Sequence, residues 1–294
     1  MQSKYKKSIL LKTKRIIAPN WKEYELIDCG NGKKLERFGA VITERPEVAA
    51  TGKPRLSQKE WSQQVTTRFT QSSANSGKWS KQLSPWSISY NGSCKLAFNL
   101  SISQFKHIGV FPEQSSNWEY IFSALQRKRN SKALNLFAYT GGASLAAKAV
   151  KSDITHVEAF SQLISKAKEN MESSGLSDVR WMKEDALSYV QKEVKRGKKY
   201  DLIIMDPPSW GRGPKGEKWK LEIQLDDLIK GVSALLNKKA YIIVNTYSGI
   251  SPEQLKERLE NHISFASVEC GNLIVEATSG SEFSTGSLVR GQVR

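Results

Sequence analysis

The clearest pattern along the chain is an alternation of apolar runs and amphipathic stretches that begins at Ser131. Apolar runs bounded by turn residues predict strands, and the periodic stretches between them predict helices. The expected strands cover 133–138, 154–158, 179–183, 201–206 and 239–246. The expected helices lie near 142–150, 161–173, 186–196, 220–236 and 252–261. This spacing predicts successive βαβ units, which build an α/β domain around a parallel sheet.

Both ends of this series carry shorter strand patterns. Two runs at the end of the chain, 267–277 and 284–293, are joined by turn residues and predict a β-hairpin. In the front section, alternating residues predict strands at 24–28, 34–38 and 40–43, a short helix near 58–65, a loop at 72–77, and a hairpin of 86–90 with 96–100. That hairpin turns at Asn91-Gly92, which suits a type I′ turn.

These patterns divide the chain into four parts. We expect a basic flexible head at 1–20, a small β-rich N-terminal domain at 21–104, a linker at 105–130 and the α/β domain at 131–294. Four tryptophans crowd the front section. They either stack on nucleic-acid bases or pack the core of the β-rich domain, and we favour the core. They are Trp21, Trp61, Trp79 and Trp86.

Charge adds information about partners. The chain of 294 residues has 45 Lys and Arg against 29 Asp and Glu, which gives a formal net charge of +16. Such a charge attracts polyanions over long distances, so RNA is an expected partner. The alternative is that the charge only keeps the protein soluble.

The number and spacing of the cysteines and histidines indicate the cellular compartment and whether a metal site is to be expected. Cys29, Cys94 and Cys270 lack the spacing of a metal site, so no metal is expected. A sparse, odd set of thiols fits the cytoplasm, and no apolar stretch is long enough to suggest a membrane span. The first acidic residue is Glu23. The basic head could therefore be a mitochondrial presequence, but its lysines favour an RNA-contacting arm or a flexible tail.

A glycine turn follows the first strand of the α/β series. The strand runs into Phe137, the turn contains Gly141 and Gly142, and a helix of small residues follows. Such a turn lets the backbone approach a ligand, and the helix N-terminus presents free N–H groups to an anion. A dinucleotide fingerprint needs G-x-G-x-x-G, whereas Ala138 takes the first position and the third glycine is missing. The pattern therefore disfavours a pyrophosphate and favours a cofactor without phosphate.

Two further motifs make this pattern more specific. Phe111-Pro112-Glu113-Gln114 precedes the α/β series, and Asp206-Pro207-Pro208-Ser209 ends its fourth strand. With the turn Asn135-Leu136-Phe137-Ala138-Tyr139-Thr140-Gly141-Gly142, the sequence resembles the class I S-adenosylmethionine-dependent methyltransferases. More narrowly, it resembles the bacterial ribosomal RNA large-subunit methyltransferase group, well over 86–293 and loosely over 21–45. The resemblance implies a Rossmann-like seven-stranded sheet whose last strand is antiparallel.

The resemblance also implies which residues hold S-adenosylmethionine. The turn lies under the methionine part through Phe137, Ala138, Tyr139, Thr140, Gly141 and Gly142. Glu158 would bind the ribose hydroxyls, and Asp185 would take the adenine amino group, a role compatible with capping the next helix. The segment that matches 105–114 lies over the cofactor in relatives, so Gln114 is the main expected contact, with Glu113 and Asn117 as further candidates; a plain interdomain linker is the alternative.

The acceptor side follows from the same resemblance and from the chemistry of methyl transfer. Asp206, Pro207 and Pro208 are the expected catalytic residues, because a fixed strand end with a carboxylate can align an acceptor. Relatives that methylate cytosine C5 need an attacking thiolate, and Tyr247 stands where they have cysteine. Attack by a nitrogen is therefore favoured. The basic loop that follows would bind substrate through Ser209, Trp210, Arg212 and Lys215.

The sequence thus predicts a cytoplasmic methyltransferase that acts on a base of RNA, with 23S ribosomal RNA as the expected substrate. One alternative is a methyltransferase for protein or a small molecule. The other is a basic RNA-binding protein with a vestigial pocket, against which the acids Glu158, Asp185 and Asp206 argue.

Overall fold

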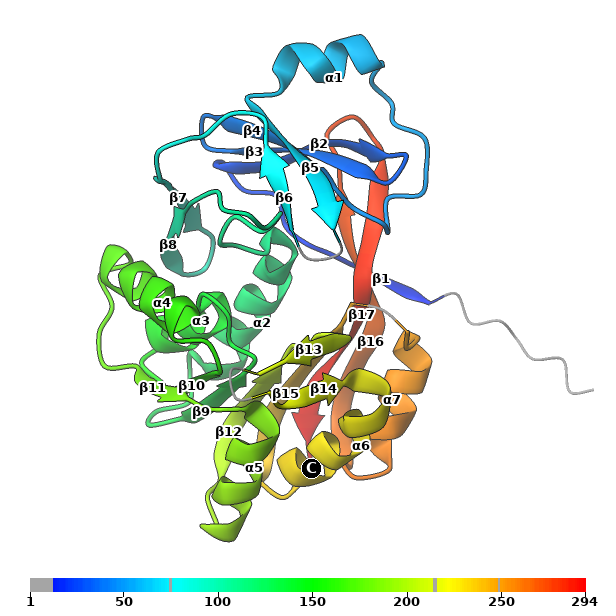
Figure 1. Cartoon of the computed structure of the whole chain (residues 1–294). Coiled ribbons are helices and arrows are strands. Elements are labelled where there is room, and N and C mark those ends of the chain that lie inside the picture. Colours follow the sequence, from blue (N-terminus) through cyan, green and yellow to red (C-terminus); the bar gives the residue numbers. More distant parts are fainter. Residues whose placement is uncertain (1–12, 74–75, 214–215, 248) are drawn as a thin grey trace, which may run out of the picture.

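A large mixed sheet forms the centre of the protein (Figure 1). The structure is a computed structural model, and it describes residues 13–73, 76–213, 216–247 and 249–294. The sheet has eight strands in the order β1-β16-β17-β15-β12-β9-β10-β11. Their bounds are β1 Lys14–Ile17, β9 Lys132–Leu136, β10 Asp153–Glu158, β11 Arg180–Lys183, β12 Tyr200–Met205, β15 Leu236–Thr246, β16 Phe265–Glu276 and β17 Glu282–Val293.

Strands β9, β10, β11, β12 and β15 run parallel, as the βαβ spacing predicts. Strand β17 lies antiparallel between β15 and β16. The Rossmann-like sheet with a final antiparallel strand is therefore confirmed. Because β9 pairs with both β10 and β12, the residues that follow these strands meet at one edge of the sheet.

Helices cover both faces of the sheet. Neighbouring residues of one strand belong to different apolar clusters: Ala133 packs with one and Leu134 with the other. This follows from the strand period, since successive side chains point to opposite faces. The helices are α2 Ser115–Leu125, α3 Gly142–Ala149, α4 Ser161–Ser173, α5 Ala186–Lys195, α6 Leu221–Ser233 and α7 Pro252–Glu260. The short 3₁₀ helix η1 (Pro112–Gln114) leads into α2.

Strand β1 corrects one prediction. Its residues were expected in the flexible head 1–20, yet they pair in parallel with Gly271–Ile274 of β16 and add an eighth strand to the expected seven. Ile16 is 4% exposed and belongs to the main apolar cluster. The lysines around it hide this strand in the sequence. Residues 1–12 of the head lie outside the described residues.

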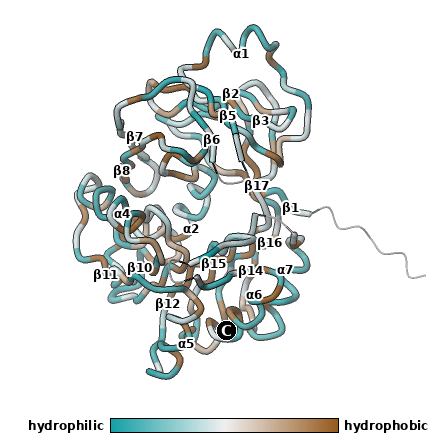
Figure 2. The backbone as a smooth tube through the Cα atoms, in the orientation of Figure 1, coloured by the Kyte–Doolittle hydropathy of each residue, from teal (hydrophilic) through white to brown (hydrophobic). Residues whose placement is uncertain are grey.

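The N-terminal unit is β-rich, as expected. A five-stranded sheet has the order β2-β3-β4-β5-β6, and β7 pairs with β8 in a separate hairpin. Helix α1 (Gln58–Gln64) is mainly hydrophilic (Figure 2), and Trp61 is its buried residue. The strands are β2 Tyr24–Gly30, β3 Lys33–Phe38, β4 Val41–Pro46, β5 Thr67–Ser73, β6 Ser76–Trp79, β7 Trp86–Asn91 and β8 Lys95–Leu100.

The pair β5 and β6 replaces the predicted loop at 72–77, of which residues 74–75 lie outside the described residues. The outer half of β5 is exposed, so its sequence shows no alternation of apolar and polar residues. The expectation that the tryptophans pack the core is correct. Trp61 and Trp79 are 4% and 7% exposed, and Trp21 and Trp86 are packed against the main cluster.

The C-terminal hairpin of β16 and β17 joins the two parts of the chain. Figure 1 shows it extending from the large sheet to the N-terminal unit. At its tip, Thr278 N donates to Leu26 O at 2.9 Å, and Ser279 Oγ donates to Asp28 Oδ1 at 2.7 Å. Asp28 is 0% exposed and also accepts from Trp61 Nε1 at 2.8 Å. The last strands of the chain therefore help to build the core of the first ones.

Candidate active site

The turn after β9 adopts an unusual backbone. Phe137 has φ +56° and Tyr139 has φ +49°, a region that few residues other than glycine occupy. Neighbouring segments hold the turn in place: Thr140 Oγ1 donates to Gly109 O at 2.7 Å, and Asn170 Nδ2 donates to Thr140 O at 3.0 Å. Helix α3 begins at Gly142, directly after this turn. Backbone strain of this kind concentrates at functional sites, where surrounding contacts sustain it.

A cavity of about 50 Å³ lies against this turn at the ends of β9 and β12. It gathers eight of the residues that the sequence predicts for the site, namely Gln114, Phe137, Ala138, Tyr139, Thr140, Gly141, Gly142 and Asp206. Ligand pockets usually enclose roughly 300 to 1,000 Å³, and the Phe111 ring lies 4.9 Å from that of Tyr139 at the cavity wall. A nucleoside would therefore have to part these side chains to enter.

Glu158 lies beside the turn, at the end of β10, and is 8% exposed. Its Oε2 accepts from Tyr139 N and its Oε1 accepts from Phe160 N, both at 3.0 Å. Burial raises the pKa of Glu158, although these N–H groups oppose the shift. The carboxylate therefore orders the turn itself. Each oxygen keeps a further lone pair for a hydroxyl group.

Asp185 does not join the residues that line the cavity. It caps α5, where its Oδ1 accepts from Ser188 N at 2.9 Å, so its predicted role as a helix cap is confirmed. It follows β11, which pairs with β10 up to Glu158 and Lys183. Asp185 is thus placed at the neighbouring strand end on the same edge of the sheet.

Asp206 follows β12 and is the most unusual group of the site. Its Oδ2 accepts from Tyr247 Oη at 2.8 Å and from Gln114 Nε2 at 3.3 Å. Its Oδ1 is buried and has no hydrogen-bond partner among the described residues. Burial raises the pKa of Asp206 to about 7, and the nearby charge of Glu113 adds to the effect. A buried acceptor without a partner is costly, and this one belongs to a residue that lines the cavity.

Trp219 holds the second of the two prolines after Asp206. Its Nε1 donates to Pro208 O at 2.5 Å, and its ring lies 5.0 Å from that of Phe137. Leu221 N donates to Ser209 O at 3.0 Å. Pro207 is buried, whereas Pro208 and Ser209 are exposed. One indole therefore contacts both Pro208 and the turn after β9.

The loop after Ser209 forms a short hairpin of β13 (Trp210–Arg212) and β14 (Lys218–Lys220). Trp210 is 52% exposed, and the Arg212 guanidinium lies 6.0 Å from its ring centroid. By contrast, Trp219, on β14, is only 6% exposed and packs on Phe137. Lys215, also predicted to bind substrate, lies outside the described residues.

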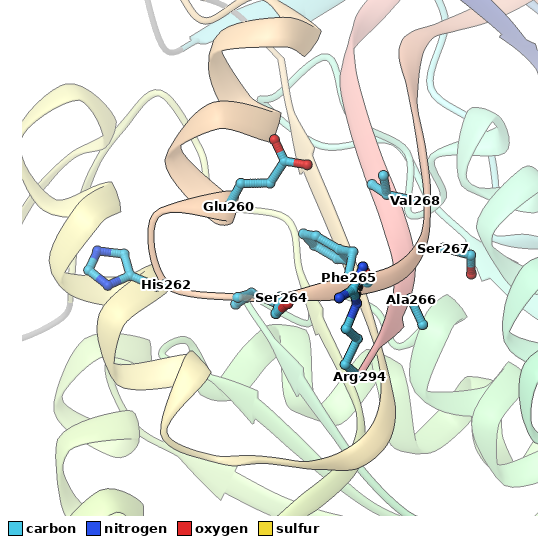
Figure 3. Close-up of a pocket in the computed structure, with 9 residues that line it drawn as sticks. Glu260, His262, Ser264, Phe265, Ala266, Ser267, Val268 and Arg294 are labelled. Atoms are coloured by element: carbon cyan, nitrogen blue, oxygen red, sulfur yellow. Dashed lines mark hydrogen bonds between the residues drawn. The ribbon is translucent and has the colours of Figure 1, made fainter.

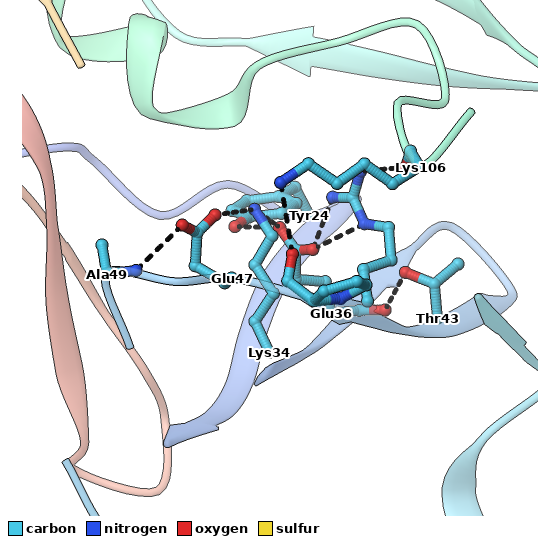
Figure 4. Close-up of polar contacts among 9 residues, drawn as sticks. Tyr24, Lys34, Glu36, Thr43, Glu47, Ala49 and Lys106 are labelled. Carbon is cyan, nitrogen blue, oxygen red and sulfur yellow. Dashed lines mark hydrogen bonds and ion pairs between the residues drawn. The ribbon is translucent and has the colours of Figure 1, made fainter. Parts of the chain in front are cut away.

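Buried charges anchor the segment that leads into the site (Figure 4). Arg45 Nε donates to Glu36 Oε2 at 3.0 Å, and Arg45 Nη1 donates to Lys106 O at 3.1 Å. Burial alone would raise the pKa of Glu36, but Arg45 and Lys34 hold it below the usual value. The N-terminal unit thus fixes the start of the 105–114 segment, whose last residue reaches Asp206.

A larger hollow of about 580 Å³ lies elsewhere (Figure 3). Its walls are the end of α7, the start of β16 and Arg294, whose Nε donates to Phe265 O at 2.9 Å. Phe265 pairs with Val293, at the opposite end of the sheet from Asp206. None of the predicted site residues lines this hollow. The larger of these two hollows is therefore not the candidate active site.

The described ranges contain neither a cluster of potential metal ligands nor a membrane-spanning helix. In residues 13–73, 76–213, 216–247 and 249–294, no group of three His, Cys, Asp or Glu side chains is arranged to hold a metal ion. No helix within those ranges has the length and apolar character needed to cross a bilayer.

Sequence reasoning missed several residues of the cavity wall. Asn135 and Trp118 line it, and Tyr247 contacts its carboxylate. Asn135 could have been included from its place near the end of β9, where it faces the same cavity as the turn. The sequence gives no sign that Trp118 lines the cavity, because its close approach to Gly142 depends on the packing of α2 on α3.

A solved structure of related sequence has the same fold. The crystal structure of the S-adenosylmethionine-dependent methyltransferase from Agrobacterium tumefaciens is 34% identical and superposes with a TM-score of 0.87. The match covers 95% of this chain and 93% of that one.

Curated relatives match a smaller part. Ribosomal RNA large subunit methyltransferase K/L of Shewanella frigidimarina is 27% identical over 150 residues, which is 50% of this chain and 20% of that protein. Ribosomal RNA large subunit methyltransferase K of Neisseria meningitidis serogroup B is 30% identical over 144 residues, or 47% of this chain and 40% of that protein. The chain thus spans less than half the length of these relatives.

The family profile covers most of the chain. The family described as S-adenosylmethionine-dependent methyltransferase matches residues 40–269. These residues include the turn after β9, Glu158 and the Asp206 corner, which together form the strand-end edge described above. The chain therefore belongs to the S-adenosylmethionine-dependent methyltransferases, with S-adenosylmethionine as its cofactor.

Proposed function

We propose that the protein methylates a nitrogen of a base in RNA, and that ribosomal RNA of the large subunit is its substrate. Two observations support an RNA substrate. The curated relatives are named as ribosomal RNA large subunit methyltransferases, and the net charge of +16 attracts polyanions. A cytoplasmic location remains our prediction, because Cys29, Cys94 and Cys270, all within the described ranges, are free thiols.

The cofactor would lie across the strand ends. The first residues of α3 line the cavity, so their free N–H groups would bind the methionine carboxylate. Glu158 would accept hydrogen bonds from the ribose hydroxyls, and Asp185 would accept one from the adenine amino group. Gln114 would close the site from the opposite side. When bound, S-adenosylmethionine supplies a methyl group that is activated by a positively charged sulfur.

Asp206 carries the proposal for the acceptor atom. Its unpaired Oδ1 can accept a hydrogen bond from an amino group. The ring nitrogen N7 of guanine has no hydrogen to give, so we favour an exocyclic amine. Methylation of an amine leaves one proton to remove, and a carboxylate with a pKa of about 7 is well matched to take it at neutral pH.

Cytosine C5 is a poorer candidate. It needs a thiolate that attacks the ring first, and no cysteine is among the residues that line this cavity. Tyr247 occupies the position of that thiol and donates its hydroxyl to Asp206 instead. Burial and the Asp206 charge raise the pKa of Tyr247, so it stays a neutral donor.

The exposed hairpin of β13 and β14 would hold the RNA. Trp210 would stack on a base that is turned out of its helix, and Arg212 would bind a phosphate. Ser209, exposed at the start of this hairpin, would touch the same nucleotide. We propose Lys215 as a further phosphate contact on the basis of the sequence alone.

Nucleoside mass spectrometry of ribosomal RNA tests this function. RNA from cells with the gene, without it, and without it but carrying a plasmid copy would be digested and compared. We expect one N-methylated nucleoside to disappear and return. Unchanged RNA, with label from S-adenosylmethionine entering only proteins or small molecules, would support the alternative substrates. Binding of RNA without any transfer would support a vestigial pocket.

A further inference from the structure

A chain of buried and partly buried hydrogen bonds leads from Asp206 to Arg290 on strand β17. Arg290 is 9% exposed and Asn117, on α2, is 0% exposed. Arg290 Nη1 donates to Asn117 Oδ1 at 3.2 Å, and Asn117 Nδ2 donates to Gln114 Oε1 at 2.8 Å. Gln114 Nε2 then donates to Asp206 Oδ2 at 3.3 Å. Arg290 lies on β17, whereas Asp206 follows the end of β12.

The chemistry of the first member fixes the direction of every bond. A guanidinium can donate hydrogen bonds but cannot accept them. Arg290 therefore holds the oxygen of the Asn117 amide toward itself and turns the amide nitrogen toward Gln114. Gln114 accepts this hydrogen bond with its amide oxygen, so its own amide nitrogen faces Asp206. An amide in isolation could adopt either orientation; here the guanidinium at one end of the chain and the ionised Asp206 carboxylate, which only accepts, at the other favour the same one.

The far end of the chain is also well held. Arg290 Nε donates to Glu269 Oε2 at 2.7 Å, and Nη1 donates to Ser116 O at 2.8 Å. The Arg290 guanidinium lies 4.7 Å from the centroid of the Tyr120 ring. Glu269 in turn forms an ion pair with Lys14 of β1. These contacts leave Arg290 little freedom, so the orientation that it imposes is stable.

We propose that Arg290 is a positioning residue for methyl transfer, because through Asn117 it keeps the amide nitrogen of Gln114 directed at Asp206. This inference rests on the proposed role of Asp206 as the residue that faces the acceptor. It assigns a function to β17 that the site itself does not reveal. The guanidinium would otherwise be explained as a structural group that pairs with Glu269 on β16 and bonds Ser116 O on α2.

Loss of this orientation has a predictable electrostatic effect. A reversed Gln114 amide would place its oxygen against the Asp206 carboxylate and disfavour the charged form. The other groups that act on Asp206 are Tyr247, which stabilises the carboxylate, and Glu113, which opposes it. Tyr247 is itself linked to the chain, because its Oη accepts from Gln114 Nε2 at 3.2 Å, so a reversed Gln114 amide would lose this contact as well. The pKa of Asp206 should therefore rise when the chain is broken, and its carboxylate form should become scarcer at neutral pH.

Substitutions of the first two members of the chain, Arg290 and Asn117, test the proposal. Arg290→Lys keeps a positive charge beside Glu269 but loses the planar fork that joins Glu269 to Asn117. Arg290→Met and Asn117→Leu break the chain outright. Arg37→Met is the matched control, because it removes an ion pair of similar geometry, Arg37 Nε to Glu25 Oε2 at 2.9 Å, in the N-terminal unit. Thermal unfolding would show which variants are folded.

The first readout does not require activity. Carboxyl ¹³C NMR, with Asp206 assigned from Asp206→Asn, would follow the titration of Asp206 in each folded protein. We expect the pKa to rise by about 0.5 to 1 unit in the Arg290 and Asn117 variants and to stay unchanged in Arg37→Met. The double variant Arg290→Met with Asn117→Leu should shift no more than the larger single shift, because both act on one chain.

The second readout is the pH profile of methyl transfer, whose acidic limb should move to higher pH with kcat lowered about 10-fold. Folded Arg290 and Asn117 variants with the wild-type titration would overturn the proposal, and so would additive shifts. If Arg290→Met does not fold, Arg290→Lys and Asn117→Leu decide the question. Full activity of Asp206→Asn would instead remove the proposed function, while the titration would still show whether Arg290 orients Gln114.

Discussion

Trp219 donates a hydrogen bond from its indole nitrogen to the carbonyl oxygen of Pro208, with 2.5 Å between the two atoms. The same ring packs on Phe137, in the turn after β9. One buried side chain thus sets the distance between the cofactor turn and the acceptor corner. Methyl transfer depends on alignment of the reacting groups, and small errors in position slow it strongly.

Trp219→Phe should therefore lower kcat about 10-fold while the affinity for S-adenosylmethionine changes little. Phenylalanine keeps a ring against Phe137 but cannot hold the Pro208 carbonyl. Trp86→Phe is the matched control, since Trp86 Nε1 donates to Phe38 O at 3.1 Å within the N-terminal unit. Steady-state kinetics with both variants checks the prediction, and equal losses in the two would contradict it.

Glu158→Ala should weaken cofactor binding by roughly 1 to 3 kcal/mol, because charge-assisted hydrogen bonds to the ribose are lost. The N–H groups of Tyr139 and Phe160 would also lose their acceptor, which loosens the turn. Calorimetry with S-adenosylhomocysteine measures the effect. Glu184→Ala removes a carboxylate that pairs with Lys192 instead and should bind like wild type. Unchanged affinity of Glu158→Ala would exclude the ribose contact.

The raised pKa of Asp206 predicts how the free energy of unfolding varies with pH. The folded pKa of about 7 exceeds the usual 3.8 of the unfolded chain, so the folded protein binds the proton more tightly. Proton binding by Asp206 therefore stabilises the folded state fully below pH 3.8, and this stabilisation is lost as the pH rises to about 7. Asp206→Asn should accordingly be more stable than wild type above pH 7, by up to roughly 4 kcal/mol, and lose this advantage in acid.

Urea unfolding of wild type and Asp206→Asn at pH 4, 6 and 8 tests whether the difference in their free energies of unfolding grows with pH as predicted. A stability difference that does not vary with pH would mean that Asp206 titrates normally. The same titration should appear in the enzyme, where activity is expected to rise with pH around 7 because the carboxylate is the active form.

Several of these features follow from the sequence for a simple physical reason. The turn after β9 and Asp206 were expected to meet because parallel strands place their carboxyl ends at one edge, and pairing of β9 with β12 does this. Other features depend on contacts across long separations. Arg290 and Asn117 are 173 residues apart, and no local pattern couples them. The burial of Trp219 depends likewise on Phe137, which lies far from it in the chain.

Strand β1 is another element that the sequence pattern does not reveal, and its packing gives a testable prediction. Ile16 is 4% exposed, whereas its neighbour Ile17 is 46% exposed. Ile16→Ala should lower the free energy of unfolding by about 2 to 4 kcal/mol, because it leaves a cavity in the main cluster. Ile17→Ala is the control and should change it by less than about 0.5 kcal/mol. Equal effects in denaturant unfolding would mean that β1 does not pack as described.

Trp210 should contribute to RNA binding but not to cofactor binding. Its exposed ring can stack on a base, so Trp210→Ala should weaken RNA affinity by about 1 to 3 kcal/mol. Ile223 is 68% exposed, and Ile223→Ala controls for the loss of an apolar surface group. Filter binding at fixed salt concentration measures both. If the two variants bind RNA equally well, the hairpin of β13 and β14 is not part of the RNA site.

Transfer of a deuterated methyl group from S-adenosylmethionine to unmodified large-subunit RNA tests the central claim most directly. The purified enzyme and its Asp206→Ala variant would be incubated with this RNA, and the digested nucleosides analysed by fragment mass spectrometry. We predict a CD₃ group on a base nitrogen with the wild-type enzyme and little or none with Asp206→Ala. Label on a base carbon, or no label in RNA from an enzyme that binds the cofactor, would contradict it.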